Sequence, residues 1–340
     1  ISNGSGDQKQ SEAITLTVNT SEAITVDTTG GTPALTLNTG DTVNYASGSG
    51  SSALVFTYTI GAGDNVDDLQ IVGFALNGGT FRDSAGNDLS TGPIVTNPVG
   101  ILVVDTTAPS APVITAISDD TGTEGDKITS DTSLTISGTG EVGASVQVSL
   151  GGSEQGSAVT VDSDGNWSYT HGSTLSAGDH SFTAVATDAA TNASSASSAY
   201  VVTVDTAAPT VAITDDTGDT SAVNGDITFT FTFSEAISGF LAEDITVANG
   251  TKGAFSQTSD RVYTLLVTPD ANSTSAVTVD VAANKATDTA GNNNTAATQA
   301  TQAVDTATPS APTISSITTP NSDNAPTLSI SAEASSTVKV

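Results

Sequence analysis

Apolar and polar residues alternate along much of this chain. In residues 227–233, Ile and Phe alternate strictly with Thr, and residues 53–60 and 181–187 show nearly the same pattern. Successive side chains of a β-strand point to opposite faces, so each segment predicts a strand with a buried apolar face and a Thr-rich face in water. No helical periodicity continues for more than a turn, and the chain is therefore expected to be all-β.

Turn-forming dipeptides divide the chain into short strands. Asp-Gly, Gly-Asp, Gly-Gly and Gly-Asn recur roughly every 8–12 residues, the spacing expected between the strands of a β-sandwich. Within one stretch of about 100 residues, the pattern predicts seven strands, at 112–118, 133–139, 144–150, 157–162, 166–170, 180–187 and 199–204. Seven antiparallel strands in this length are typical of an immunoglobulin-like sandwich.

A six-residue phrase, Val-Asp-Thr-x-x-Pro, sets the size of the domains. It occurs at 104–109, 204–209 and 304–309, so the repeat is 100 residues long. A domain-sized period indicates an array of similar folding units. We therefore predict complete domains at 106–205 and 206–305, as tandem immunoglobulin-like seven-stranded antiparallel β-sandwiches arranged end to end.

The two ends of the sequence carry parts of the same pattern. Residues 6–24 mirror 225–237, where Gly-Asp precedes an alternating strand and Ser-Glu-Ala-Ile follows it. Residues 328–333 resemble 134–141. We expect residues 1–105 to form a domain that lacks its first strand, and residues 306–340 to be the truncated start of a fourth domain.

The sequence is strongly acidic, with 29 Asp and 8 Glu against 7 Lys and Arg, and a net charge of −30. This charge argues against nucleic acid and anionic membranes as partners, because both are bound through Lys and Arg. The hydrophobic content of 36% falls in alternating runs, which argues against an acidic disordered tail. Asp is a turn residue and a short oxygen ligand, so its excess over Glu points to the loops.

The sequence contains no Cys. This excludes disulfides and thiolate metal sites, and such a Ser-, Thr- and Gly-rich chain suits a bacterial surface protein that folds outside the cell. No stretch approaches 18 apolar residues, and no charged-then-apolar leader begins the sequence. We expect a monomeric segment of a longer exported protein, without membrane insertion of its own and with targeting signals elsewhere.

Four series of acidic residues recur in step with the repeat. They occupy the Val-Asp-Thr phrase, the loop after the second strand, the loop after the sixth strand and the loop after the first strand. In that order, they are Asp105, Asp205 and Asp305; Glu22, Glu141, Glu235 and Glu333; Asp83, Asp188 and Asp288; and Asp119, Asp120, Asp126, Asp215, Asp216 and Asp226.

Loops of an antiparallel unit alternate between its two ends. The loops after the second and sixth strands therefore share the end where the chain enters, and the loop after the first strand lies where it leaves. The predicted groups are Asp105 with Glu141 and Asp188; Asp205 with Glu235 and Asp288, approached by Asp119, Asp120 and Asp126; and Asp305 with Glu333, approached by Asp215, Asp216 and Asp226.

Several carboxylates would then converge at each joint between domains. At about 4 Å, two like charges repel by about 1 kcal/mol even in water, and no basic residue recurs at the joints. Several Ca²⁺ ions at the joints would neutralise them, and Ca²⁺ fits better than Mg²⁺ because the oxygen ligands are numerous and loop-borne. The alternative is that these residues cap turns and keep the surface soluble. Asp64, Asp67 and Asp68 either hold an extra Ca²⁺ or form a solvated loop.

Three phrases together resemble a known family. Val-Asp-Thr-x-x-Pro, Asp-x-Ala-Gly-Asn (83–87 and 288–292) and Asp-Gly-Asn-Trp-Ser-Tyr (164–169) are similar to those of bacterial immunoglobulin-like repeats. Such repeats form the extender regions of large RTX-type, type I-secreted adhesins of Gram-negative bacteria. The resemblance implies a non-catalytic stalk, rigidified by Ca²⁺, that projects a distal ligand-binding region for cell adhesion and biofilm formation. Residues 7–105 look like a different subtype.

Two other functions compete with a stalk. A carbohydrate- or peptide-binding module would need exposed aromatic side chains, but the aromatic content is 4%. Trp167 is expected to anchor a core rather than to serve as a platform for a sugar. An enzyme such as a glycosidase is disfavoured because the acidic residues repeat in every unit, whereas an active site should occur once.

Overall fold

The computed structural model describes residues 6–89, 100–218, 222–315, 329–334 and 336–339. Strands dominate these residues, and the single helical element among them is the 3-10 turn η1 (Ala242–Asp244), so the all-β prediction is confirmed. None of the described helices has the length and apolarity needed to cross a membrane. Two compact units are present, Ile1–Asp119 with Ser133–Val202 and Asp120–Thr132 with Thr203–Val340.

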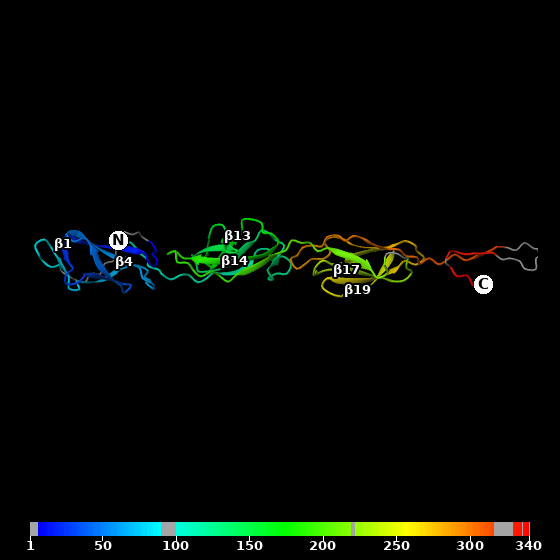
Figure 1. The fold of residues 1–340 in the computed structure, drawn as a ribbon, viewed down its shortest axis with the longest axis horizontal. Helices are drawn as coiled ribbons and strands as arrows, with labels where there is room; N and C mark the ends of the chain where they lie inside the picture. Colours follow the sequence, from blue (N-terminus) through cyan, green and yellow to red (C-terminus); the bar gives the residue numbers. More distant parts are fainter. Residues whose placement is uncertain (1–5, 90–99, 219–221, 316–328, 335, 340) are drawn as a thin grey trace, which may run out of the picture. The chain divides into compact units, whose positions relative to one another are not determined.

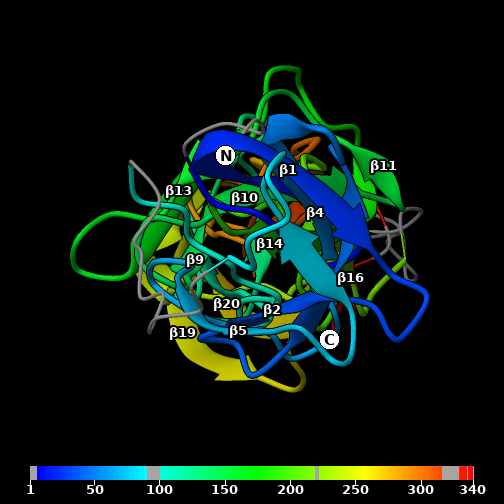
Figure 2. The same ribbon diagram turned by 90° about the vertical axis from the view of Figure 1, so that its left-hand side faces the viewer.

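The first six strands form one sheet in the order β5-β2-β3-β4-β1-β6. Their bounds are β1 (Ala13–Asp27), β2 (Ala34–Leu37), β3 (Thr42–Ser47), β4 (Ser51–Thr59), β5 (Ile71–Ala75) and β6 (Thr80–Arg82). β1 and β4 are antiparallel neighbours and lie side by side in Figures 1 and 2. Along β4, the predicted alternation buries Leu54, Phe56 and Tyr58 in the core of this sheet.

The next strands fall where the alternation predicted them. They are β7 (Val113–Ile117), β9 (Thr135–Thr139), β10 (Ser145–Leu150), β12 (Val159–Thr160), β13 (Asn166–Thr170), β14 (Gly178–Thr187) and β15 (Tyr200–Val204), with two short additions, β8 (Ile128–Thr129) and β11 (Ser153–Glu154). β9 lies between β13 and β7, while β10 pairs with β11, β12 and β14. All seven predicted strands are therefore present.

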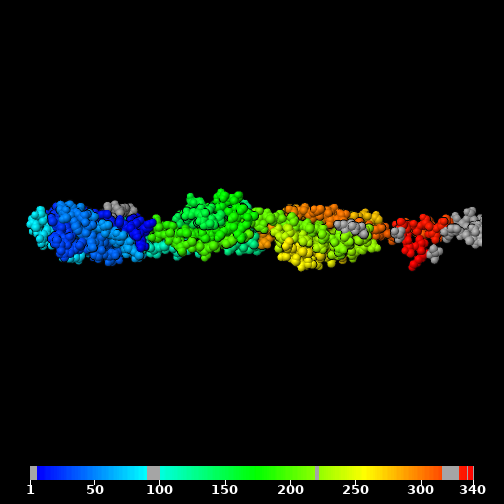
Figure 3. Space-filling model, in the orientation of Figure 1, coloured from blue at the N-terminus to red at the C-terminus, as the bar shows by residue number. Residues whose placement is uncertain are grey.

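The described part of residues 206–305 also contains seven strands. They are β16 (Val211–Asp215), β17 (Ile227–Phe233), β18 (Ile245–Ala248), β19 (Gly250–Gln257), β20 (Val262–Pro269), β21 (Val277–Val281) and β22 (Ala300–Gln302). They form two sheets, β16-β17-β20-β19 and β18-β21-β22. Between the sheets lies an aromatic core in which Phe233 and Tyr263 pack against Phe240. The edge strand β19, yellow in Figure 3, lies at the surface. A short pair, β23 (Thr313–Ile314) and β24 (Ile330–Ser331), follows.

A parallel pairing recurs that the purely antiparallel prediction did not include. In each repeat, one residue of a short segment pairs in parallel with the Val of Val-Asp-Thr. The pairs are Gln8 with Val104, Thr129 with Val204, and Val223 with Val304. The next amide, that of Asp105, Asp205 or Asp305, donates to the carbonyl of Gln8, Thr129 or Val223 at 2.9, 2.8 and 2.9 Å. These segments have too few residues to show an alternation.

Glu22 does not occupy the loop that the sequence predicted for it. It lies inside β1, which continues without a break from Ala13 to Asp27. The register of β1 shifts between Asn19 and Ile24, and the last residues of the strand pair with β6 instead of β4. The polar Ser-Glu step is thus accommodated by an irregularity within a strand, so the prediction that a loop begins here is wrong.

Candidate metal centre

Asp205, Glu235 and Asp288 come together from three loops. Asp205 follows β15, Glu235 follows β17, and Asp288 lies in the turn after β21. Each offers one carboxylate oxygen, and these oxygens all lie within 4.8 Å of one another. Within the part of the chain that the structure describes, no other three His, Cys or acidic side chains meet this closely. Strand parity predicted this group from the sequence.

The turn at 288–292 fixes Asp288. One oxygen of its carboxylate accepts from the Asn292 backbone N–H at 2.8 Å, and the other accepts from Asn292 Nδ2 at 2.9 Å. Gly291 provides the positive φ of 85° that closes the turn. Asp288 is only 5% exposed, so its charge is held in a partly dehydrated position.

Asp205 is held through its N–H, its C=O and one carboxylate oxygen. Its N–H donates to Thr129 O at 2.8 Å, and its C=O accepts from Asn292 Nδ2 at 2.8 Å. Its Oδ1 accepts from the Ala207 N–H at 2.9 Å, which closes an Asx turn. The carboxylate therefore has a fixed position next to the turn that carries Asp288.

The electrostatics of Glu235 record the crowding of negative charge. Burial raises its pKa, and the neighbouring carboxylates of Asp288 and Asp205 raise it further. Arg261 acts in the opposite direction but directs its guanidinium to the carbonyls of Phe233 and Ser234. A bound cation would remove the mutual repulsion that these three carboxylates retain.

The donor set fits a hard divalent cation. All three side chains offer oxygen, and two oxygens bound to one Ca²⁺ lie at most about 5 Å apart, since each Ca–O distance is about 2.3–2.6 Å. The observed limit of 4.8 Å meets this condition. Asp120, in the same unit, has a buried Oδ1 with no hydrogen-bond partner among the described residues, while its Oδ2 accepts from Gly125 N at 2.8 Å.

The group around Asp105 has the same framework but does not bring three carboxylates together. Asn192 binds Asp188 through its N–H and its Nδ2, at 2.8 and 2.9 Å, and Nδ2 also donates to Asp105 O at 2.9 Å. Glu141, however, is exposed, whereas Glu235 is partly buried. The predicted convergence of Asp105, Glu141 and Asp188 is absent from the close groups of acidic side chains in the described residues.

At the joint that begins with Asp305, the acidic side chains mainly bind backbone N–H groups. Glu333 Oε2 accepts from Ser310 N at 3.0 Å, directly after the repeated phrase, and Asp305 Oδ1 accepts from Ala307 N at 3.2 Å. These bonds bring Glu333 to the start of the following segment, as the parity of the strands predicted. They do not bring its carboxylate and that of Asp305 into a close group of three within the described residues.

After the first strand of their domains, Asp126, Asp216 and Asp226 each accept a hydrogen bond from a group in the same domain. Asp126 Oδ1 accepts from Ile128 N at 2.8 Å, and Asp216 Oδ1 accepts from Thr228 N at 2.9 Å. Asp226 Oδ1 accepts from Thr268 Oγ1 at 2.7 Å. Burial opposes the ionisation of Asp215, but hydrogen bonds from Thr217 and Gly218 outweigh it and lower the pKa of Asp215. Asp119 lies at a positive φ of 48°.

Asp83 repeats the turn of Asp188 and Asp288 in the first domain. Asn87 Nδ2 donates to Asp83 Oδ2 at 2.7 Å, and hydrogen bonds from Asn87 are the main reason that the pKa of Asp83 is lowered. Glu22 is exposed and, like Asp83, belongs to no close acidic group among the described residues.

Sequence reasoning missed the part played by Asn192 and Asn292. Each amide joins the Asp of its own turn to the carbonyl of the Asp that ends the previous repeat. The signal was present, because Asn recurs four residues after Asp in every copy of the turn. An amide carries no charge, so a pattern of recurring carboxylates does not select the amide that positions two of them.

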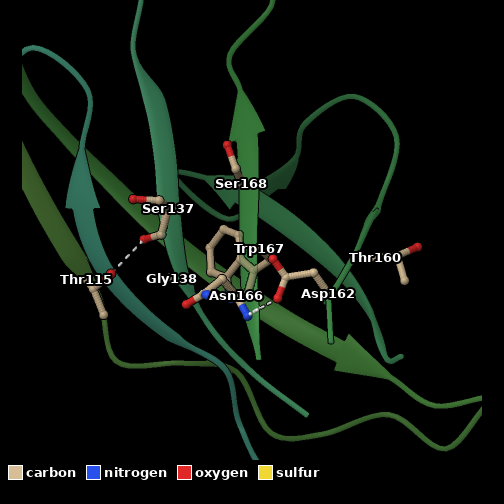
Figure 4. A pocket seen from close by; sticks show the side chains of 8 residues that line it. All are labelled: Thr115, Ser137, Gly138, Thr160, Asp162, Asn166, Trp167 and Ser168. Carbon is tan, nitrogen blue, oxygen red and sulfur yellow. Dashed lines mark hydrogen bonds between the residues drawn. The ribbon is translucent and has the colours of Figure 1, made fainter. Parts of the chain in front are cut away.

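A shallow hollow beside Trp167 tests the competing interpretation of a sugar platform (Figure 4). Its rim carries Thr115, Ser137 and Ser168, and Asp162 accepts from Asn166 N at 2.8 Å in the adjoining turn. Trp167 is only 3% exposed, and its Nε1 donates to Thr139 O at 3.0 Å. The ring is a core side chain, as predicted, and offers no free face on which a sugar could stack.

Comparison with known families gives the repeats a name. Residues 107–206 match one family model and residues 205–304 match another, and both models describe a bacterial Ig-like domain. The chain carries bacterial Ig-like domains in tandem. The boundary between the two matched domains falls at Asp205, so the acidic group described above lies where one Ig-like domain passes into the next.

Three solved structures that match the chain share little sequence with it. A tetra-tandem repeat in the extending region of a large adhesion protein is 18% identical, with 92% of this chain and 76% of that chain covered and a TM-score of 0.29. Fibronectin(III)-like modules of Clostridium thermocellum CbhA are 15% identical, with 59% and 90% covered and a TM-score of 0.28. An ICAM-5 ectodomain fragment is 11% identical, with 91% and 76% covered and a TM-score of 0.28. A search of curated proteins gave no match.

Proposed function

We propose that these bacterial Ig-like domains are a non-catalytic extender of a bacterial surface adhesin. The chain would act as a stalk that is rigidified by Ca²⁺ at the joints between domains. It would project a distal ligand-binding region, outside this sequence, for cell adhesion and biofilm formation. The resemblance of its repeated phrases suits an RTX-type adhesin secreted by a type I system.

One observation carries this proposal. At Asp205, a single residue bonds to both neighbouring domains, because its N–H donates to Thr129 and its C=O accepts from Asn292. The carboxylate of the same residue lies within 4.8 Å of those of Glu235 and Asp288. A cation held by these three groups would connect the linker to two loops of the following domain and would oppose bending at Asp205.

The surface chemistry supports the same role. A net charge of −30 keeps a long array soluble and repels nucleic acid and anionic lipid. The absence of Cys from the sequence suits a chain that is exported and folds outside the cell. The Asp–Asn turn and its bond to the linker carbonyl recur in successive domains, which suits a structural element better than an enzyme.

The test is calcium binding by the whole chain and by two charge-neutral variants. In Asp288→Asn, one ligand of the group is lost while the shape of the side chain is kept, so Ca²⁺ binding at this group should weaken strongly. For the parent, Ca²⁺ at about one hundred times its Kd should stabilise the third domain by about 2.7 kcal/mol. Asp188→Asn, in the corresponding turn of the second domain, is the matched control and should leave this stabilisation in place. Calorimetric titration and thermal unfolding provide the two measurements.

Small-angle scattering with and without EDTA tests the mechanical part of the proposal. We expect the maximum dimension to shorten, or the chain to become more flexible, when Ca²⁺ is removed. An unchanged maximum dimension together with an unchanged Tm would reject calcium as the agent that stiffens the joints.

A further inference from the structure

The tip of the loop between β7 and β8 docks on the turn that carries Asp288. Both segments belong to the same compact unit. Thr121 Oγ1 donates to Ala290 O, and the Thr123 N–H donates to Thr289 O at 3.3 Å. Thr121 Oγ1 in turn accepts from the Ser130 N–H at 2.7 Å, so the hydroxyl is held in place from its own side. We call residues 121–123 the tongue and residues 289–291 the socket.

Two glycines allow the tongue and the socket to approach each other. A Cβ added to Gly122 would lie 2.0 Å from Thr289 O, and one added to Gly291 would lie 2.9 Å from Gly122 N. Both distances are shorter than any side chain tolerates against backbone. Both glycines also have positive φ, 77° and 85°, which favours Gly over every other residue. The contact is therefore specific for Gly on each side.

The contact uses no ionised group. Its hydrogen bonds join hydroxyl, amide and carbonyl groups, and Ala290 at its centre is 1% exposed. Neither repulsion between carboxylates nor a bound cation enters these bonds. The tongue and socket can therefore hold in the absence of calcium, although the socket begins at the residue directly after Asp288.

We propose that the tongue and socket are a second, cation-independent lock between consecutive Ig-like domains, and that Gly at the position of Gly291 decides which domain can follow a domain with an Asp-Asp-Thr-Gly loop. The partner of the tongue is thus a turn of the type Asp-x-Ala-Gly-Asn. This lock goes beyond the calcium-dependent role and does not require it.

The sequence of the other domains agrees with such a rule. The turn at 188–192 has Thr191, at a φ of 67°, where the socket has Gly291. The Cβ of Thr191 would fill the space that a tongue glycine such as Gly122 occupies. The domain before this turn, residues 1–105, also contains no Asp-Asp-Thr-Gly sequence that could form a tongue. Asp-Asp-Thr-Gly recurs at residues 215–218, where Gly218 has a φ of 71° and an added Cβ would meet none of the described atoms within 4 Å. In that loop, Thr217 Oγ1 donates to Asp215 Oδ1 at 2.6 Å, so the hydroxyl that corresponds to Thr121 Oγ1 bonds within its own loop.

The decisive experiment compares Gly291→Thr with Gly239→Thr. Gly239 lies in the same domain, with a φ of 81° and open space around its Cβ position, so the control carries a similar backbone strain without meeting the tongue. The chain has no Cys, so spin labels can be attached at Ser153→Cys and Ser256→Cys, both exposed positions. Distances between the labels are measured in EDTA, where calcium cannot contribute.

We expect a narrow distance distribution for the parent and the control in EDTA, and a clearly broader one for Gly291→Thr. Thr121→Val, which removes the hydroxyl, should broaden it as well, whereas Thr121→Ser should not. Exchange of the Thr123 amide should become at least about tenfold faster in Gly291→Thr. Equal distributions for Gly291→Thr and Gly239→Thr would overturn the proposal. A parent whose distribution in EDTA is as broad as that of Gly291→Thr would overturn it as well. None of these outcomes depends on whether Ca²⁺ binds at Asp205.

Discussion

The joints at Asp105 and Asp205 share one hydrogen-bond scheme but differ in their charges. In both, an Asn amide joins the turn Asp to the carbonyl of the phrase Asp. Only at Asp205, among the described residues, does a partly buried Glu complete a group of three carboxylates, because Glu141, its counterpart at Asp105, is exposed. The two turns also differ at two positions, with Ala189 and Thr191 in one and Thr289 and Gly291 in the other.

This difference teaches that a repeated motif preserves a framework more reliably than it preserves a site. The Asp–Asn turn depends on local hydrogen bonds, which each copy can form alone. A metal group depends also on the exposure and direction of a third side chain from another loop. The same reasoning holds for the tongue, since one Cβ in the socket is enough to prevent its approach.

The largest effect on stability is expected from removing the Asn side-chain amide that the two joints share. Asn292→Ala and Asn192→Ala each remove an amide that bonds to a carboxylate and to a linker carbonyl, so each should lower the free energy of unfolding of its domain by about 2 kcal/mol. Urea unfolding followed by fluorescence of Trp167, the only Trp, reports on Asn192→Ala. Hydrogen exchange of core amides in the third domain reports on Asn292→Ala.

Asn87→Ala is the control for this comparison. The side chain of Asn87 bonds within its own turn, to Asp83, in an exposed position. Its loss should cost less than about 1 kcal/mol. Equal losses in all three variants would mean that the bonds to the linker carbonyls contribute nothing.

A smaller effect is expected from making the turn at 188–192 resemble the turn at 288–292. Thr191 is a β-branched residue at a φ of 67°, which is strained, and Thr191→Gly should raise the free energy of unfolding of the second domain by about 1 kcal/mol. Trp167 fluorescence in urea measures the change. Thr160→Gly, in strand β12, should instead destabilise by about 0.5–1 kcal/mol, because Gly loses more chain entropy there. A loss of stability in Thr191→Gly would contradict the assignment of strain.

The smallest effect concerns the charge on Glu235. Its pKa is raised in the folded protein, so folding favours its protonated form. The corresponding stability is present below the pKa of the unfolded chain and is lost as the pH rises from there through the raised folded value. At pH 7 in EDTA, Glu235→Gln should therefore stabilise the third domain, by less than about 1 kcal/mol because the group is partly exposed.

Glu141→Gln provides the comparison, since Glu141 is exposed and lies in no close acidic group among the described residues. Relative to the parent, this variant should change stability in EDTA less than Glu235→Gln does. Thermal unfolding between pH 4 and pH 7 measures both variants, and an equal response would remove the distinction between the two joints.

Much of the fold was present in the sequence, because alternation over five or more residues defines a strand and its buried face. The strand Ile227–Phe233 and the turn at 288–292 are clear examples. The segment at Ile128–Thr129 has only two residues, and its pairing depends on the distant Val204. Strand parity brought Asp205, Glu235 and Asp288 together correctly. It could not distinguish Glu141 from Glu235, since side-chain exposure depends on packing that no local pattern records.

The parallel pairing at the end of each repeat also affects how the chain bears tension. Lys127 O and Thr129 O accept from the amides of Thr203 and Asp205 at 2.9 and 2.8 Å. Because these two segments run in the same direction, a pull toward opposite ends of the domain loads both bonds at once, in shear, and does not open them one after another. A bond ladder loaded in this way resists stretching better than one that is unzipped. Asp205, at the end of this ladder, also accepts from Asn292 Nδ2 of the following domain, and this bond would carry part of such a load.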